Sequence, residues 1–260
     1  MGTAQTFQFI QYGVSEGLAT LAINRPPFNV LDIPTMAEVN DALDACALDP
    51  SVKLLVITGV GEKAFSAGVE VADHTPDKVD RMIEVFHGIF RRLQRLPMPS
   101  VAVVNGAALG GGMELAIGCD MVLAVAGAKF GQPEIKLAVF PPIAALLLPR
   151  LVPPVRAMEI LLGGENFSAE DAKAMGLVNR VFPREGFAAD VHAFLAPFLK
   201  LSRVALLSTR RAMREAAGQP FEAALGRVEG IYLNELMRTD DAKEGLAAFL
   251  EKRKPVWRNS

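Results

Sequence analysis

Short apolar runs alternate with amphipathic stretches over the first two-thirds of the chain. The apolar runs predict strands at Ala19–Asn24, Val52–Gly59, Ser100–Gly106 and Met121–Ala126. The amphipathic stretches predict helices over Thr35–Asp49 and about Asp77–Leu96, and a short helix after the glycine run through about Ile117. The run ending at Gly59 is typical of a strand buried on both faces. This alternation predicts an α/β core.

Strand patterns nearly vanish from Pro153 onward, where "GLVNRVFP" (Gly176–Pro183) is the one late strand candidate. The remaining pattern predicts helices around Pro154–Leu162, Ala169–Met175, Gly186–Leu199, Arg203–Ala217, Phe221–Met237 and Thr239–Lys252. The chain is therefore expected to divide into a β/α core over residues 1–200 and a helical region over residues 201–260. The helical region is expected to pack on its own core or on another subunit.

Composition narrows the class of protein. The chain has 260 residues, of which 51% are hydrophobic, and this is enough for one large core. Its net charge of −2 lacks the positive excess expected of a nucleic-acid binder. Cys46 and Cys119 have no metal-ligand spacing and are expected to be free core thiols in a reducing cytoplasm. "MGTAQTFQFIQYG" lacks a secretory pattern, and its Met-Gly start with Thr6 matches a myristoylation site weakly. With no apolar run of 18 residues, a soluble protein without a membrane partner is expected.

Two segments share the order buried strand, glycine-containing turn, helix: "VITGVGEKAFSAGVEV" (Val56–Val71) and "VAVVNGAALGGGMELA" (Val101–Ala116). Helix N-termini offer free N–H groups, so converging loops would clamp one carbonyl oxygen as an oxyanion site. Tight helix–strand packing is the alternative explanation of the glycines. They match neither a dinucleotide fingerprint nor a phosphate-binding P-loop.

Two glutamates stand near these glycines. Glu114 is expected in the first turn of its helix, where the helix dipole would keep it ionised as a general base. Glu134 follows in "KFGQPEI", and paired carboxylates can hold one water between them. A surface charge or helix cap is the alternative for each. His74 follows the first glycine loop and is a weaker candidate to line a ligand cleft, while no residue pattern suggests a metal site.

Five segments, in their order along nearly the whole chain, resemble the crotonase (enoyl-CoA hydratase/isomerase) superfamily. They are "INRPPFNVLD", "VITGVGEKAFSAGVEV", "PSVAVVNGAALGGGMELAIGCDMVLAVAGAKFGQPEIKL", "FSAEDAKAMGLVNRVFP" and "TDDAKEGLAAFLEKRKPVW". The resemblance implies a ClpP/crotonase-like spiral of ββα turns with a C-terminal helical trimerisation region, assembled as a homotrimer or as a hexamer built from two trimers. The implied ligand is an acyl-coenzyme A thioester, with no metal and no cofactor beyond the coenzyme A of the substrate.

The resemblance also implies roles for individual residues. The thioester carbonyl would lie between the backbone N–H groups of Val69 and Gly111. Glu114 and Glu134 match both catalytic carboxylates of the hydratases: Glu114 would take a proton from water, and Glu134 would protonate carbon or share the hydrogen bonds of that water. The implied contacts to the ligand come from Arg25, Ala67, Gly68, Val71, His74 and Gly110. Lys252 or Lys254 would reach a coenzyme A phosphate, across a subunit boundary if need be.

The chain departs from the common hydratase pattern after Glu134. "IKLAVFPPIAALLLPRLVPP" places Phe140, Pro141, Pro142 and Ile143 where hydratases usually carry a proline and a Gly-Ala-Gly-Gly-type turn, so the acyl pocket is expected to be drier and bulkier. This segment resembles the branch that hydrates cyclohexa-1,5-diene-1-carbonyl-CoA in anaerobic benzoyl-CoA degradation, where water would add across the diene, further from the thioester. A linear 2-enoyl-CoA hydratase and an enoyl-CoA isomerase are the alternatives. A non-catalytic or RNA-binding protein of the same fold is more remote.

Overall fold

A computed structural model describes residues 7–259 of the chain. The N-terminal expectations about secretion and myristoylation rest on Met1–Thr6, which lie outside the described residues together with Ser260. Within residues 7–259 no single helix is long and apolar enough to cross a membrane, and one pair bent by 96° passes that test by length and composition alone.

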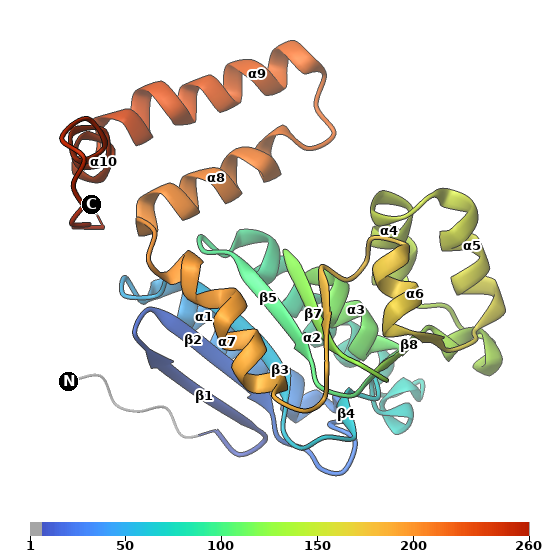
Figure 1. The fold of residues 1–260 in the computed structure, drawn as a ribbon. Coiled ribbons are helices and arrows are strands. Elements are labelled where there is room, and N and C mark those ends of the chain that lie inside the picture. The colour runs from blue at the N-terminus through green and yellow to red at the C-terminus, as the bar shows by residue number, and fades with distance from the viewer. Residues whose placement is uncertain (1–6, 260) are drawn as a thin grey trace.

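In residues 7–259, ten strands form two sheets (Figure 1). The six-stranded sheet runs β1 (Ile10–Ser15), β2 (Leu18–Ile23), β3 (Leu54–Gly59), β5 (Ser100–Val104), β7 (Met121–Val125) and β10 (Arg180–Phe182). The four-stranded sheet runs β4 (Ala64–Ser66), β6 (Ala107–Leu109), β8 (Lys129–Gly131) and β9 (Phe167–Ser168). Every neighbouring pair is parallel except β1–β2 and β8–β9. The expected α/β core is confirmed.

The chain repeats one unit, in which a strand of the large sheet leads to a short strand of the small sheet and then to a helix. Successive units are β3–β4 with α2 (Val79–Arg95), β5–β6 with α3 (Gly111–Gly118), and β7–β8 with α4 (Pro142–Leu151). A 3₁₀ turn precedes α2 at Val71–His74, and a second one precedes α4 at Pro133–Leu137. This repetition is the expected ββα spiral, and it brings the ends of successive units to one side of the molecule.

Helices cover both faces of the large sheet (Figure 1). On one face α1 (Ile33–Leu48) and α2 bury the main apolar cluster. On the other face α7 (Phe187–Leu199) packs Val191 and Leu195 against Leu54, Val56 and their sheet neighbours. The apolar character of β3 on both faces follows from this arrangement. Cys46 and Cys119 are both buried and free, as expected.

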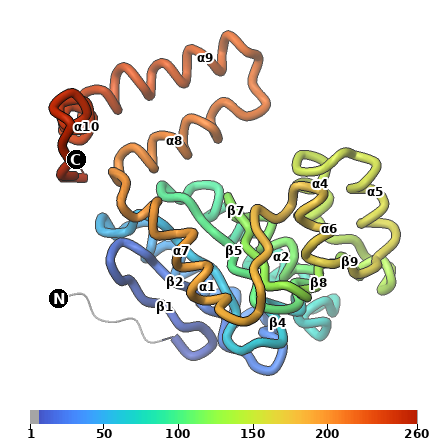
Figure 2. Tube along the Cα trace, viewed as in Figure 1, coloured from blue at the N-terminus to red at the C-terminus, as the bar shows by residue number. Residues whose placement is uncertain are grey.

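The remaining helices do not cover the faces of the large sheet. They are α5 (Pro154–Gly163), α6 (Ala169–Ala174), α8 (Arg203–Ala216), α9 (Phe221–Glu229) and α10 (Asp240–Leu250). Of these, α5 and α6 contribute buried residues to the main apolar cluster. The tube in Figure 2 shows α4, α5 and α6 grouped on one side of the sheets, and α8, α9 and α10 extending away from them. Residues 201–260 thus hold the last three helices, while a domain boundary at residue 200 stays a prediction.

Three sequence expectations need correction. The short strands β4, β6, β8 and β9 were not predicted, because two or three residues are too few to give a periodic pattern. Strand β1 was not predicted either. The segment with Pro141 and Pro142, which was expected only to add bulk to the acyl pocket, begins the helix α4. The helix tolerates both prolines because they occupy its N-cap and first position, where a backbone N–H has no acceptor within the helix. The helix expected over Phe221–Met237 ends at Glu229. It continues as a π-helical segment, Gly230–Glu235, and a 3₁₀ turn, Leu236–Arg238.

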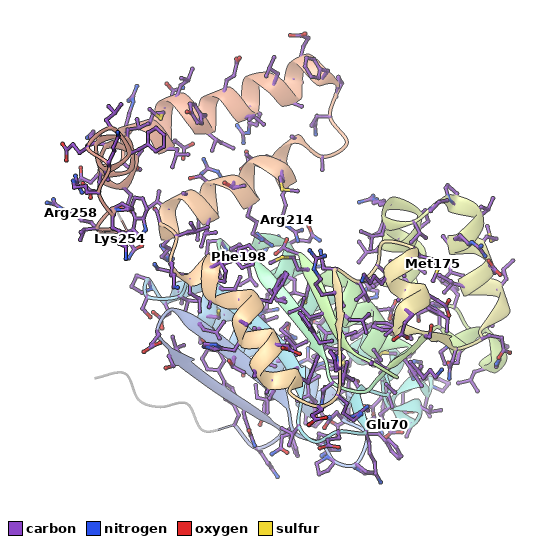
Figure 3. The ribbon with its side chains drawn as sticks, viewed as in Figure 1. Glu70, Met175, Phe198, Arg214, Lys254 and Arg258 are labelled. Atoms are coloured by element: carbon purple, nitrogen blue, oxygen red, sulfur yellow. The ribbon has the colours of Figure 1, made fainter. Side chains whose placement is uncertain are left out.

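A buried ion pair fastens α8 to the core. Arg210 is 7% exposed, and its Nε lies 2.9 Å from Oδ2 of Asp120, which directly precedes β7. The same guanidinium donates to the carbonyl oxygens of Leu93 and Leu96 at the end of α2. Arg214 reaches the other oxygen of Asp120 at 2.7 Å and points from α8 toward the sheet in Figure 3. Loss of Arg210 would leave the carbonyl oxygens of Leu93 and Leu96 without this donor, while Asp120 would keep Arg214 and Ser100.

Replacement of Arg210 with leucine should therefore lower the free energy of unfolding by about 2–3 kcal/mol, because two carbonyl oxygens lose their side-chain donor and Asp120 loses one of its charged partners. The midpoint of urea denaturation at a fixed protein concentration measures this loss. Arg211→Leu is the matched control on the same helix, since its pairs with Glu215 and Glu235 are exposed and worth less than about 1 kcal/mol. Equal losses in the two variants would contradict the assigned role of Arg210.

Candidate active site

One cavity of about 880 Å³ collects most of the residues singled out by the sequence. Its walls come from the two glycine loops, α2, the 3₁₀ turn at Pro133–Leu137 and the start of α4. Ala67, Gly68, Val69, Val71, His74, Gly110, Gly111, Glu114, Glu134, Phe140, Pro141 and Pro142 all line it. The cavity therefore joins parts of the chain that are far apart in sequence.

The two glycine loops meet at this cavity. A Cβ built on Gly68 would lie 3.3 Å from the backbone nitrogen of Gly111, and one built on Gly111 would lie 3.3 Å from the nitrogen of Val69. Among residues 7–259, neither of these two N–H groups has a hydrogen-bond acceptor. Two unpaired donors thus stand close together on the cavity wall, as the converging-loop hypothesis requires. Tight packing of the glycines is present as well, so the two explanations are compatible.

Glu114 is buried in α3, with 2% of its surface exposed. Its Oε1 accepts a hydrogen bond of 2.7 Å from the backbone N–H of Ala144, in the first turn of α4. Burial, with a contribution from the charge of Glu134, nevertheless raises the pKa of Glu114 to about 8. The expectation that the α3 dipole keeps this carboxylate ionised is therefore wrong for the unliganded site. Desolvation outweighs the helix N-terminus, and the neutral form prevails at pH 7.

The segment after Glu134 supplies donors as well as bulk. Phe140, Pro141 and Pro142 line the cavity as expected, whereas Ile143 is buried and does not line it. Because the prolines occupy the N-cap and first position of α4, the next free N–H groups are those that face Glu114. The two prolines therefore shape the wall without removing the backbone hydrogen bond that Glu114 receives.

Glu134 lies in the 3₁₀ turn before α4, and burial raises the pKa of its carboxyl. The fully buried Gln132 has its side-chain amide beside both carboxylate oxygens. On another side, Gly110 has φ +52°, and a Cβ there would lie 2.6 Å from Oε1 of Glu134. Only glycine combines that backbone conformation with so close an approach. Glu134 is thus closely confined, and Gln132 is a site residue that sequence reasoning missed although it stands two positions before Glu134.

Sequence reasoning also missed the apolar wall supplied by α2. Val79, Met82, Ile83 and Phe86 line the cavity from this helix. Their spacing of three and four residues marks one helix face, from which the sequence predicted an amphipathic helix but no part in the site. Lys136 lines the cavity too, and its Nζ lies 2.8 Å from Glu165. Within residues 7–259, no cluster of three His, Cys, Asp or Glu side chains is arranged to hold a metal ion.

Arg25 lies outside this cavity. It lines a separate hollow with Phe9, Phe28 and Glu70, pairs with Asp32, and holds its guanidinium 4.6 Å from the centre of the Phe9 ring. Its predicted contact with the ligand stays a prediction.

The C-terminal lysines also lie elsewhere, since neither Lys252 nor Lys254 lines the cavity of its own chain. Figure 3 shows Lys254 beside Arg258 at the C-terminal end and far from Glu70. Contact between either lysine and a ligand in this cavity would require a neighbouring subunit, and it stays a prediction.

The raised pKa of Glu114 makes a stability prediction. Between pH 4.5 and about 8 the folded protein holds a proton on this carboxyl that the unfolded chain releases, so this group makes stability fall as pH rises. Glu114→Gln removes the titration. Relative to this variant, the wild-type midpoint of urea denaturation should therefore decrease from pH 5 to pH 8 and level off above. A difference between the two proteins that stays constant over that range would contradict the burial argument.

Comparison with known proteins agrees with this architecture. A family model described as enoyl-CoA hydratase/isomerase matches residues 13–260. Crotonyl-CoA hydratase of Syntrophomonas wolfei is 37% identical over 92% of this chain and 94% of its own, and cyclohexa-1,5-dienecarbonyl-CoA hydratase of Thauera aromatica is 35% identical over 93% of each. A solved enoyl-CoA hydratase from Geobacillus kaustophilus superposes with a TM-score of 0.94 over 98% of each chain, at 28% identity. The chain belongs to the enoyl-CoA hydratase/isomerase family.

Proposed function

We propose that the protein adds water to a conjugated unsaturated acyl-CoA thioester, and that its substrate is cyclohexa-1,5-diene-1-carbonyl-CoA. The observation that carries the proposal is one largely apolar cavity whose wall holds the buried Glu114, the half-buried Glu134 and two unpaired backbone N–H groups. Paired carboxylates suit proton transfer to and from a bound water, and paired N–H groups suit a thioester oxygen that gains charge.

The general activity follows from the family. Relatives that cover more than nine-tenths of the chain are named as hydratases of unsaturated acyl-CoA esters, so the protein is an enzyme of the enoyl-CoA hydratase type, a hydro-lyase. Relatives named for a crotonyl and for a cyclic dienoyl substrate are similar at 37% and 35% identity. Sequence identity therefore does not distinguish between the two acyl groups, and the proposal for the acyl group depends on the shape of the cavity.

The two N–H groups form the proposed oxyanion hole. When water attacks the β carbon, electron density moves to the thioester oxygen and an enolate forms. Donors from Val69 and Gly111, already unpaired and held by the tight contact between their loops, would stabilise that charge without first breaking other hydrogen bonds. A donor of this kind contributes on the order of 3–4 kcal/mol to the transition state.

The glutamates complete the hydration. Glu114 takes one proton from the attacking water, the oxygen of that water bonds to the β carbon, and Glu134 delivers a proton to the enolate. Because the two carboxyls share the site, their titration belongs to the pair. In the unliganded site the proton is on Glu114, so a water bridging the two carboxyls passes it to Glu134 before the reaction. Hydration then ends with a proton on Glu114 again, which completes the cycle. No cofactor beyond the coenzyme A of the substrate takes part.

The cavity wall favours a compact ring. Met82, Ile83 and Phe86 form one apolar side, and Phe140 with the two prolines forms another. Such walls exclude water from the acyl group and match the shape of a six-membered ring better than that of a long flexible chain. In the cyclic diene, the enolate extends over the second double bond, so the proton can be delivered to its far carbon and leave a new double bond between the two reacting positions.

The alternatives predict other properties. An isomerase needs no water held between its carboxyls, and a linear enoyl-CoA needs no bulky wall. A non-catalytic or RNA-binding role leaves the two glutamates of the cavity without a purpose, and the net charge of −2 gives RNA phosphates little attraction. We also propose a cytoplasmic location for the enzyme.

We further propose assembly as a trimer or a hexamer. Apolar side chains on the extended C-terminal helices, Phe221 of α9 with Phe249 and Leu250 of α10, are each at least 75% exposed. Such surfaces on helices that leave the core suit burial against other subunits.

Turnover of two acyl-CoA esters tests the substrate. Purified enzyme should hydrate cyclohexa-1,5-diene-1-carbonyl-CoA with a kcat/KM well above that for crotonyl-CoA, with products separated by chromatography and identified by mass. A shifted double bond without added water would indicate an isomerase. Turnover of crotonyl-CoA alone would overturn the cyclic substrate and keep the hydratase.

Glutamine variants test the proton-transfer roles. Glu114→Gln and Glu134→Gln should each lower kcat by roughly 10²–10⁴-fold, because a positioned acid or base contributes on this scale. Binding of the CoA ester, measured by calorimetry, should change little, since the thioester contacts remain. Wild-type kcat in either variant would remove that glutamate from the mechanism.

A further inference from the structure

Two phenylalanines of α2 contact the two ends of α3. Phe86 and Phe90 stand one helical turn apart, and their rings pack edge to face with centres 5.0 Å apart. The helix α3 begins at Gly111 and ends at Gly118. A Cβ built on Gly111 would lie 3.0 Å from Cζ of Phe86, and one built on Gly118 would lie 3.0 Å from the ring of Phe90. Each end of α3 therefore rests against one ring of the same aromatic pair.

The position of α3 matters because this helix carries two groups of the proposed reaction. Gly111 supplies one N–H of the proposed oxyanion hole, and Glu114 follows three residues later. All eight residues of α3 are buried. A helix of about two turns has little stability of its own, so the surfaces on which it packs fix its place. At the end that holds the N–H donor, one of these surfaces is the ring of Phe86.

The contact at Gly111 also involves the second donor residue. Cγ2 of Val69 would lie 2.7 Å from the same built Cβ that lies 3.0 Å from Phe86. The ring and this methyl group thus fill the space that a side chain on Gly111 would occupy. We propose that Phe86 is a positioning residue that holds the Gly111 N–H in line with the Val69 N–H, an inference that rests on the proposed oxyanion hole.

The ring is suited to this role because it has little freedom to move. Phe86 is 2% exposed and packs against a second ring, so it has no alternative position in solvent. A shorter side chain would leave a void beside Gly111 into which the start of α3 could shift. A donor stabilises the charge on a thioester oxygen only while it is aimed at that oxygen. A small displacement of Gly111 should therefore reduce the rate.

Phe86→Leu and Phe90→Leu form a matched pair of variants. Phe86→Leu should lower kcat by about 10–50-fold, because it displaces one oxyanion donor without removing it. Phe90, 6% exposed, belongs to the same ring pair but contacts the end of α3 that carries no reacting group. Phe90→Leu should therefore lose comparable stability in urea denaturation and keep kcat within about threefold of wild type. Wild-type kcat in Phe86→Leu, or equal losses of kcat in both variants, would overturn the proposal.

The carbonyl group of a bound thioester reports on the donors directly. Cyclohexanecarbonyl-CoA labelled with ¹³C at the carbonyl is a suitable probe, because its saturated ring cannot be hydrated. Hydrogen bonds from two N–H groups weaken the C=O bond, so wild-type enzyme should move its infrared stretching band to lower frequency than in water. Phe86→Leu should keep only part of this shift, and Phe90→Leu should keep all of it. The full shift in Phe86→Leu would overturn the proposal.

A control is needed because Phe86 also lines the acyl pocket. Ile83 lines the same side of the cavity, whereas the three heavy atoms nearest to a Cβ on Gly111 belong to Val69 and Phe86. Ile83→Ala should therefore widen the pocket and keep the full infrared shift, whatever its effect on KM. If Ile83→Ala loses as much of the shift as Phe86→Leu, pocket width rather than the contact with Gly111 places the carbonyl, and the proposal is wrong.

The infrared band also separates this inference from the function on which it rests. If wild-type enzyme leaves the band where it is in water, the proposed oxyanion hole fails and the role of Phe86 fails with it. A wild-type shift that Phe86→Leu retains defeats only the role of Phe86. If Phe86→Leu does not fold, Phe86→Met, which keeps the length of the side chain and loses the ring, should show the reduced shift. The full shift in that variant would again overturn the proposal.

Discussion

The site depends on the burial of a carboxylate, Glu114, that needs a hydrogen-bond donor from another part of the chain. That donor is the backbone N–H of Ala144 in the first turn of α4. A helix N-terminus is a favourable partner for a carboxylate because its N–H groups have no acceptor within the helix. The hydrogen bond thereby joins α3 to α4 across the cavity. The position of α4 then places the turn that carries Glu134 and the bulky wall that follows it.

Close approach between backbones is the second constraint. The first glycine loop contacts the second at Gly68 and Gly111, and Gly110 contacts the side chain of Glu134. A methyl group at any of these positions would occupy space already filled. By bringing the loops into contact, the glycines leave the unpaired N–H groups of Val69 and Gly111 on one wall, so tight packing is compatible with the proposed oxyanion site. The two explanations that sequence alone left open are aspects of one arrangement.

Much of this was predictable from residues that act through local patterns. The apolar strands, the α1 and α2 helices and the two strand–glycine–helix segments follow from periodicity and turn residues, and the resemblance to a family pointed to the residues of the glutamate pair. The short strands β4, β6 and β8 were not predictable, because two or three residues carry no period. The α4 helix was hidden by prolines that its N-terminus tolerates. The contact of Gln132 with Glu134 was not predictable, because it depends on how the turn after β8 folds back.

The amino-acid pattern thus sufficed for an α/β enzyme core, for glycine loops suited to an anionic oxygen, and for two candidate carboxylates. Tertiary structure decided how those carboxylates behave. Glu114 was expected to be ionised by its own helix, yet the surrounding side chains exclude water and raise its pKa to about 8. The cost of burying charge depends on everything packed around a residue, and that packing is set by α2, α4 and the loops together. The local sequence predicts the helix and its dipole. It does not predict how much water the neighbouring elements exclude from the carboxyl group.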